Sequence, residues 1–263
     1  RAARNAKESP AIPAPITRKS AVICGQHVPG IPTEKGNLSF VLLDRPAAAE
    51  AGWPMRFFIT GTDTGVGKTY VTCLLLEGLR NAGVDAVGYK PVACGDREDA
   101  TLLAAASGGI DTALVNPVFL NTPVAPYVAG MLENRTVDQA ELLAGFAKIS
   151  TSHESVLVEG VGGWEVPIAA NYRVSDLAAD LGLPVILVAG NKLGALNHIL
   201  LTVDAIRAKG LVCVGIFLNQ LEDEMDTAMI TNKGVIEDLT GVPLLDHLIY
   251  GQDFIDLERF LTL

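Results

Sequence analysis

The chain has 263 residues, 49% of them hydrophobic and 19% charged, which is enough apolar material for one large α/β domain. The cysteines are scattered without a C-x-x-C pair, no apolar run reaches the roughly 18 residues that span a bilayer, and the N-terminus lacks a secretory signal, so we expect a cytoplasmic protein. The formal net charge of −10 argues against a nucleic acid or an anionic membrane as a partner.

Residues 1–54 differ in composition from the rest of the chain. They hold seven of the 14 prolines and seven Lys or Arg against four Asp or Glu, which leaves a net charge of −13 after position 54. We predict a Pro-rich leader over 1–54, disordered or foreign to the native protein, and one domain over 55–263 with its natural start at Met55. A transit peptide is the alternative, which the prolines oppose because they interrupt an amphipathic helix.

Apolar strands and amphipathic helices alternate from Met55 onward. A strand at Arg56–Thr60 leads through a glycine-rich turn into a helix over Lys68–Asn81 that stops before Gly83. The pattern Thr136-Val137-Asp138-Gln139 has the form of a capping box and predicts a helix start. We therefore predict, in order, a strand, a short helix, an extended segment and a longer helix over Val84–Tyr89, Glu98–Ala106, Ala113–Leu120 and Thr136–Lys148.

The second half of the chain continues this alternation. A buried strand at Ser155–Val158 ends at Glu159 and precedes a run that we expect to be flexible, Gly160–Gly163. A strand, a helix, a strand, a helix and a strand follow over Pro184–Val188, Ala195–Lys209, Leu211–Leu218, Lys233–Leu239 and Leu244–Leu248. Near-continuous apolar strands separated by helices predict an α/β fold with a mostly parallel sheet covered by helices on both faces.

The glycine-rich turn after the first strand predicts a phosphate-binding loop. Its glycines let successive backbone N–H groups point at one anion, and the helix that follows adds its positive dipole end. In such a loop Lys68 reaches the β- and γ-phosphates and the Thr69 hydroxyl holds Mg²⁺. Position 62 is threonine, so the first glycine comes one residue early. The alternative is a turn without ligand, and the candidate nucleotide-binding residues are Gly61, Thr62, Asp63, Thr64, Gly65, Val66, Gly67, Lys68 and Thr69.

Three polar residues end predicted strands at the sheet edge where ligands bind in such folds. Lys90 places a cation before Pro91, where the charge of a phosphate would develop. Glu159 follows three apolar residues and is a candidate metal ligand, and Asn219 ends a later strand. A strand-capping surface lysine and an exposed loop glutamate are the alternatives for the first two. Together these residues complete the pattern of a P-loop NTPase-type domain.

Four ordered segments resemble the dethiobiotin synthetase family: Gly61–Thr69, Gly88–Ala93, Val158–Trp164 and Lys192–His198. The likeness runs from about Met55 to Gly251. It implies an ATP- and Mg²⁺-dependent cyclo-ligase of biotin biosynthesis, which forms carbon–nitrogen bonds. Such an enzyme closes 7,8-diaminononanoate with CO₂ to dethiobiotin through a carbamate and a carbamic-phosphoric anhydride, and it releases ADP and phosphate.

The resemblance also assigns roles to residues. It implies that Lys68, Lys90 and Thr64 are catalytic, that Asn219 reads adenine, and that Mg²⁺ is held by Thr69, Asp99 and Glu159. Cys94 stands where the family usually has a hydroxyl residue, which puts that substrate contact in doubt because a thiol is a weaker hydrogen-bond partner. The implied substrate-binding residues, the last three facing the neighbouring subunit of a homodimer, are Thr64, Lys90, Cys94, Gly194, Ala195 and Asn197.

Two alternatives share the predicted fold. A partitioning or positioning ATPase carries a signature lysine where this chain has Asp63, and the charge of −13 after position 54 opposes assembly on an anionic surface. A cobyrinate-type amide synthetase activates another carboxylate and adds a glutaminase with a catalytic cysteine, for which we find no fitting Cys–His pair. We therefore expect ATP, CO₂ or bicarbonate, and the diamine as ligands.

Overall fold

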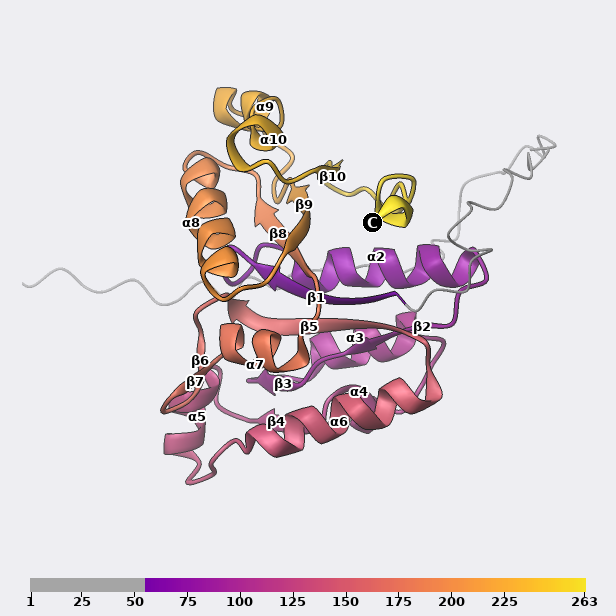
Figure 1. The fold of residues 1–263 in the computed structure, drawn as a ribbon, viewed down its shortest axis with the longest axis vertical. Coiled ribbons are helices and arrows are strands. Elements are labelled where there is room, and N and C mark those ends of the chain that lie inside the picture. Colours follow the sequence, from indigo (N-terminus) through magenta and orange to yellow (C-terminus); the bar gives the residue numbers. More distant parts are fainter. Residues whose placement is uncertain (1–54) are drawn as a thin grey trace, which may run out of the picture. The chain divides into compact units, whose positions relative to one another are not determined.

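A computed structural model describes residues 55–263, so the predictions for residues 1–54 lie outside the described residues. Six strands form one sheet in the order β10-β9-β8-β1-β5-β2, and every neighbouring pair is parallel (Figure 1). The predicted parallel sheet is confirmed. In chain order its strands are β1 Arg56–Gly61, β2 Ala86–Tyr89, β5 Ser155–Gly163, β8 Val185–Gly190, β9 Cys213–Asn219 and β10 Leu244–Leu248.

Helices cover both faces of this sheet, as predicted. Successive strand side chains point to opposite faces, so Phe57 and Ile59 join one buried cluster while Phe58 joins the other. The first cluster packs against α2 Lys68–Asn81, α3 Glu98–Ala106 and α4 Thr112–Val115. The second packs against α6 Gln139–Ser152, α7 Val174–Leu181, α8 Ala195–Ala208 and α10 Ile236–Thr240. No helix among residues 55–263 is long and apolar enough to cross a membrane.

Two small sheets and several short helices lie outside the central sheet. β3 Val92–Cys94 pairs in parallel with β4 Val118–Leu120, and β6 Pro167–Ala169 pairs antiparallel with β7 Tyr172–Arg173. The β3–β4 pair begins two residues after Lys90 and fixes the chain that leaves β2. The remaining helices are α5 Pro126–Leu132, α9 Thr227–Asn232 and the 3₁₀ turn Phe260–Thr262.

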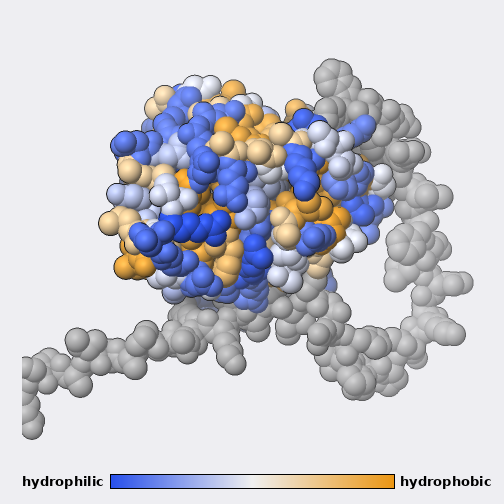
Figure 2. Space-filling view, turned by 90° about the horizontal axis from the view of Figure 1, so that it is seen from below, coloured by the Kyte–Doolittle hydropathy of each residue, from blue (hydrophilic) through white to orange (hydrophobic). Residues whose placement is uncertain are grey.

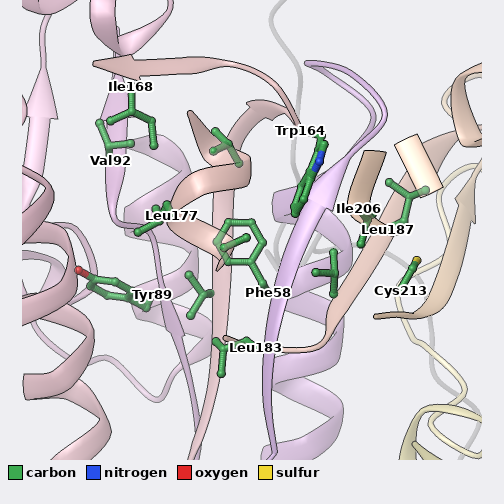
Figure 3. Packing of buried hydrophobic residues seen from close by; sticks show 14 of the residues in the cluster. Phe58, Tyr89, Val92, Trp164, Ile168, Leu177, Leu183, Leu187, Ile206 and Cys213 are labelled. Atoms are coloured by element: carbon green, nitrogen blue, oxygen red, sulfur yellow. The ribbon is translucent and has the colours of Figure 1, made fainter. Parts of the chain in front are cut away.

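An aromatic pair packs β1 against the residue that follows β5. Phe58 of β1 meets Trp164 edge-on, with the ring centroids 6.3 Å apart and the planes at 82° (Figure 3). Figure 3 shows Leu177 of α7 and Leu187 of β8 on either side of this pair. Because Trp164 follows β5 directly, this packing holds the end of β5 against β1.

Helix starts differ from the prediction at two places. Helix α6 begins at Gln139 because Asp138 is its N-cap and accepts a hydrogen bond from the Ala140 N–H at 2.9 Å, so the capping box predicted at Thr136 is wrong. The predicted extended segment Ala113–Leu120 is wrong in its first half. Asp111 caps the one-turn helix α4 there, and only Val118–Leu120 is a strand.

Three further differences concern the second half of the chain. The run Gly160–Gly163 is not a flexible loop but the end of β5, because Gly163 pairs with Gly61 of β1. The helix predicted over Lys233–Leu239 begins three residues later, as α10 over Ile236–Thr240, and a separate helix α9 precedes it over Thr227–Asn232. The elements that we did not predict are β3, β6, β7, α4, α5, α7, α9 and the 3₁₀ turn Phe260–Thr262.

Candidate active site

The loop between β1 and α2 wraps around the ammonium group of Lys68. Lys68 is buried, and its Nζ donates a hydrogen bond to the Asp63 carbonyl at 3.2 Å, across the loop. The loop is held from outside by Asn219 of β9, whose Nδ2 donates to the Val66 carbonyl at 3.0 Å. Gly67 has a φ of +87°, and a Cβ there would lie 2.1 Å from the Asn219 Nδ2. Only glycine therefore allows this loop and this asparagine together.

A second cation, Lys90, lies in a buried cluster beside the loop. Tyr89 pairs with Val158, and this register places Lys90 beside Glu159. The Lys90 Nζ lies 2.6 Å from Glu159 Oε1 and 2.7 Å from Asp99 Oδ2 of α3. Lys90 is 2% exposed and Glu159 is fully buried. The alternatives of a surface lysine and an exposed loop glutamate are therefore wrong.

Thr69 joins this cluster from the first turn of α2. Its hydroxyl donates a hydrogen bond to Glu159 Oε1 at 2.8 Å, so the same carboxylate oxygen accepts from Thr69 and from Lys90. The three residues that the resemblance assigned to Mg²⁺ thus belong to one cluster, in which Asp99 and Glu159 bond the Lys90 ammonium and Thr69 bonds Glu159. Their role as metal ligands stays a prediction.

Burial and neighbouring charges set the pKa values in the cluster. Burial lowers the pKa of Lys90, but Glu159 and Asp99 together outweigh it and hold that pKa above its ordinary value. Burial raises the pKa of Asp99, but Lys90 outweighs it and keeps that pKa below its usual range. The pKa of Lys68 is lowered to about 8, first by burial and then by the Lys90 charge. Lys90 and Asp99 are therefore ionised at neutral pH.

The chemistry of this cluster fits a magnesium ion. Glu159 Oε2 is buried without a hydrogen-bond partner, so one carboxylate oxygen remains for a ligand. Carboxylate and hydroxyl oxygens are the hard ligands that Mg²⁺ prefers. Among residues 55–263 no three His, Cys, Asp or Glu side chains gather as a metal cage. An ion here would complete its shell with water and phosphate oxygens, as Mg²⁺ commonly does in nucleotide sites.

Sequence reasoning missed the residue that holds the backbone of Lys90. Asn116, fully buried after α4, donates from Nδ2 to the Lys90 carbonyl at 2.8 Å and to the Val118 carbonyl at 2.9 Å. Its Oδ1 accepts from the Arg97 Nε at 3.1 Å. The Lys90 N–H donates to the Val115 carbonyl at 2.8 Å. Asn116 precedes a proline, which marks a turn in the sequence, but nothing local indicates its distant partner.

Thr64 is exposed at the tip of the loop, next to Asp63, which lines a hollow. Its N–H donates to the Asp63 carboxylate at 2.7 Å. The hollow has a volume of about 400 Å³ and lies between the loop, the end of β5 and α8; among its lining residues are Asp63, Trp164, Glu165, Leu201 and Thr202. It is large enough to hold a small molecule next to the loop.

Of the other predicted substrate residues, Cys94 lies close enough to Lys90 to interact with its charge, and the remaining three lie apart from it. Cys94 is half-buried in β3, and burial raises the pKa of its thiol to about 11. Gly194, Ala195 and Asn197 form the start of α8, which follows β8. Since β8 flanks β1 on the side opposite β5 and β2, the phosphate-binding loop separates these three residues from Lys90. The structure does not bring them into the cluster of the same chain.

The strand ends on the far side of the loop form a buried polar network. The Asn191 N–H donates to the Asn219 carbonyl at 2.7 Å, and its Nδ2 lies 2.9 Å from the Met229 carbonyl and 3.2 Å from the His247 Nε2. Asn232 donates to the Asn191 Oδ1 at 2.9 Å. The network ties Asn219 to α9 and β10. The Oδ1 of Asn219 and its second amide hydrogen remain for a ligand, and its reading of adenine stays a prediction.

Comparison with known proteins gives the family. Residues 55–250 match the AAA domain family. An ATP-dependent dethiobiotin synthetase BioD from Akkermansia muciniphila is 54% identical over 208 residues, which cover 78% of this chain and 97% of the relative. A protein of the same name from an Anaeromyxobacter species is 44% identical over 209 residues, covering 78% and 94%.

Among solved structures, FtsY of Thermotoga maritima aligns with a TM-score of 0.50 at 14% identity, covering 79% of this chain and 67% of that one, which supports the fold alone. The curated relatives, at much higher identity, give the family assignment. Because this chain spans nearly their whole length at such identity, it belongs to the family of ATP-dependent dethiobiotin synthetases.

Proposed function

We propose that this chain closes the cyclic urea of dethiobiotin from 7,8-diaminononanoate, CO₂ and ATP. Membership of the family supports this activity. The observation that carries the site assignment is the buried Lys90 ammonium, bonded to Glu159 and Asp99 beside the phosphate-binding loop. A cation held there can stabilise the negative charge of the transferring phosphate and of the carbamate that accepts it.

The reaction needs a phosphate because a carbamate is a poor electrophile. One amine of the substrate adds to CO₂ and loses a proton, which gives the carbamate. A carbamate oxygen then attacks the γ-phosphorus of ATP, the bond to the β-phosphate oxygen breaks, and ADP leaves. The second amine attacks the carbonyl carbon of the mixed anhydride and loses a proton, phosphate departs with the bonding electron pair, and the ring is closed.

The residues of the cluster divide this work. Lys68 binds the β- and γ-phosphates, and Lys90 stabilises the transferring phosphoryl group and the carbamate. Thr64 orients the substrate at the tip of the loop. Thr69, Asp99 and Glu159 hold Mg²⁺, which when bound neutralises charge on the phosphates. Asn219 binds adenine while its amide also holds the loop at Val66.

We also propose that the active enzyme is a homodimer. Gly194, Ala195 and Asn197 lie across the loop from Lys90 in their own chain, so the role that the resemblance assigns to them requires a second subunit. Gly194 is the N-cap of α8, and the unpaired N–H groups of a helix start suit the carboxylate at the far end of the substrate. Leu193 and Leu201 flank this segment and are 80% and 62% exposed, which supports an apolar contact there.

A cytoplasmic location is part of the proposal. Cys94 and Cys213 carry thiols rather than disulfides. Burial raises the pKa of each thiol to about 11, so both stay protonated and unreactive at neutral pH. This usage is typical of proteins in a reducing compartment.

The reaction itself can be tested with isotope-labelled bicarbonate. The protein is mixed with ATP, Mg²⁺, ¹³C-bicarbonate and 7,8-diaminononanoate, and the products are examined by mass spectrometry. We expect ADP and dethiobiotin whose ureido carbon carries the label. Folded protein that binds ATP but yields no labelled dethiobiotin contradicts the substrate assignment and leaves the nucleotide site standing.

The two lysines have separable roles. We expect Lys90→Ala to abolish turnover while most of the ATP affinity remains, because Lys90 serves the acceptor side. Lys68→Ala should weaken both, since Lys68 contacts the phosphates. ATP binding is measured by calorimetry and turnover by the labelled assay. Equal loss of ATP affinity in the two variants would contradict the division.

A further inference from the structure

Lys90 occupies the space between two carboxylates that also form the candidate metal site. Its Nζ lies 2.6 Å from Glu159 Oε1 and 2.7 Å from Asp99 Oδ2. A magnesium–oxygen bond is about 2.0–2.1 Å long. An ion bonded to both of these oxygens therefore lies where the ammonium group lies. The ion and the Lys90 ammonium therefore cannot both bond to Glu159 Oε1 and Asp99 Oδ2 at the same time.

Electrostatics reinforces this exclusion. Lys68 and Lys90 are close enough for the charge of Lys90 to lower the pKa of Lys68. A divalent ion added to two lysines would repel both in a region where Lys90 and Glu159 are shielded from water. Moving the Lys90 ammonium away from Glu159 and Asp99 relieves this repulsion and leaves both carboxylates for the ion.

Only the side chain of Lys90 needs to move. Its backbone is held on both sides, by the N–H bond to the Val115 carbonyl and by the Asn116 amide on its own carbonyl, each 2.8 Å long. Proline follows at position 91 and restricts the chain further. Rotation about the four-carbon stem can therefore carry the ammonium from the carboxylates toward the loop while β2 stays in place.

We propose that Lys90 is a built-in competitor of the divalent cation, which displaces it from Glu159 and Asp99 and so delivers the ammonium to the reacting phosphate and carbamate. The inference rests on the proposed function for the destination of Lys90. The exchange makes the lysine available only when the metal is in place. It also keeps the affinity for the metal low until the phosphates of ATP supply the missing negative charge.

The test measures Mn²⁺ binding to the nucleotide-free chain by electron paramagnetic resonance of the unbound ion. We expect Lys90→Met to lower the Mn²⁺ dissociation constant at least tenfold, because the competitor is gone. Lys90→Arg keeps a cation on both carboxylates and should stay within threefold of the wild type. Lys148→Met removes a charge from the exposed side of α6 and serves as the matched control, with an unchanged constant.

A double variant locates the gain. Adding Glu159→Gln to Lys90→Met should return the dissociation constant to at least the wild-type value, since the freed carboxylate is removed. If Lys90→Met does not fold, Lys90→Gln replaces it, because its amide donates to the same oxygens without a charge. In the wild-type chain with ¹⁵N-labelled lysine, added Mg²⁺ should shift the Lys90 Nζ resonance.

The outcomes separate the two proposals. Mn²⁺ bound no more tightly by the neutral Lys90 variants, or a Lys90 Nζ resonance unmoved by saturating Mg²⁺, overturns the competition. Neither measurement contains ATP or diamine, so failure of the labelled synthesis assay leaves their result intact. Conversely, labelled dethiobiotin from a chain without the competition upholds the function and rejects the exchange.

Discussion

Asn116 fixes the position of Lys90 without touching any candidate ligand. Its amide nitrogen bonds the carbonyls of Lys90 and Val118, and its carbonyl accepts from Arg97. A fully buried amide that uses both ends in this way defines the path of the chain on either side of it. The direction in which the Lys90 ammonium leaves β2 therefore depends on a residue 26 positions later in the sequence.

We expect Asn116→Ala to lower kcat about tenfold while KM for ATP stays within twofold. The backbone of Lys90 loses its hydrogen bond from Asn116, whereas the phosphate-binding loop is unchanged. Stability should fall by about 1–3 kcal/mol, the usual cost of leaving buried partners unsatisfied. Steady-state kinetics and urea unfolding measure the two effects. Asn121→Ala, at an exposed asparagine, is the control and should change neither. Wild-type kcat in a destabilised Asn116→Ala protein would argue against positioning.

Sequence patterns predicted the lysines, Thr69 and Glu159 of the site, and Asn219 that holds the loop, but missed Asn116 and Asn191. Lys68 and Thr69 belong to a contiguous loop, and Lys90 and Glu159 each end a strand, so local patterns mark them. Asn116 and Asn191 act through partners far away in the sequence. No pattern near either asparagine encodes that distance, and only the fold reveals the contact.

Among the elements, α2 and α3 were predicted to the residue, over Lys68–Asn81 and Glu98–Ala106. A clear apolar stripe and a glycine stop define α2. The glycine run of β5 was not predicted, because glycine disfavours strands and the pairing of Gly163 with Gly61 is a tertiary effect. Helix α7 was missed as well. Its eight residues give a short pattern, and its start depends on Asp176 accepting from the Arg173 N–H.

The phosphate-binding loop packs closely against Asn219 of β9 at Gly67. Gly67→Ala places a methyl group against the Asn219 amide, so we expect loss of the Asn219–Val66 hydrogen bond and at least a tenfold weaker binding of ATP, measured by calorimetry. The matched control is Gly83→Ala. Gly83 has a φ of +85° and open space around it, so this variant should lose only about 1 kcal/mol of stability. Equal ATP affinities in the two variants would show that the clash is unimportant.

The network at the ends of β8 and β10 predicts a dependence of stability on pH. His247 lies beside the Asn191 amide, Lys233 and Asp246; burial and then Lys233 lower its pKa, against the opposing effect of Asp246. The folded protein thus favours the neutral ring. Its stabilising contribution is present above the ordinary pKa of 6.5 and is lost as the pH falls through the lower pKa of the folded state.

Relative to His247→Gln, the wild-type chain should lose up to about 1.4 kcal/mol of stability for each pH unit below pH 6.5, until the ring is protonated in both states. Urea unfolding of both proteins between pH 5 and pH 7.5 measures the difference. Parallel pH profiles would mean that the imidazole ring does not titrate with folding.

At the scale of the whole molecule, composition and alternation predicted the fold class but not the order of the strands. The order depends on which apolar strands meet across long connections, and all of them have similar patterns. The surface is mixed as well. Figure 2 shows hydrophobic patches separated by hydrophilic residues on the face seen from below. No pattern in the sequence indicates which of these patches would face the second subunit of the proposed dimer.

The proposed dimer makes a testable demand on α8. We expect Leu201→Lys to shift the protein from dimer to monomer and to abolish synthesis, because a charge replaces an exposed leucine beside the segment that serves the partner. Light scattering after size-exclusion chromatography gives the mass. Val212→Lys, at a valine that is 65% exposed outside α8, is the control and should remain dimeric. A fully active Leu201→Lys monomer would exclude a site shared between subunits.

The central place of β1 governs when the protein can fold. Its first partner to be synthesised is β5, and Arg56 pairs with Val156, about a hundred residues later. At about 5–20 residues per second, a ribosome needs roughly 5–20 s to make that partner. The apolar residues of β1 stay unpaired throughout that interval, and the contact of Thr69 with Glu159 must form across 90 residues. Such distant pairing slows folding, so we expect the nascent chain to depend on chaperones until β5 has emerged.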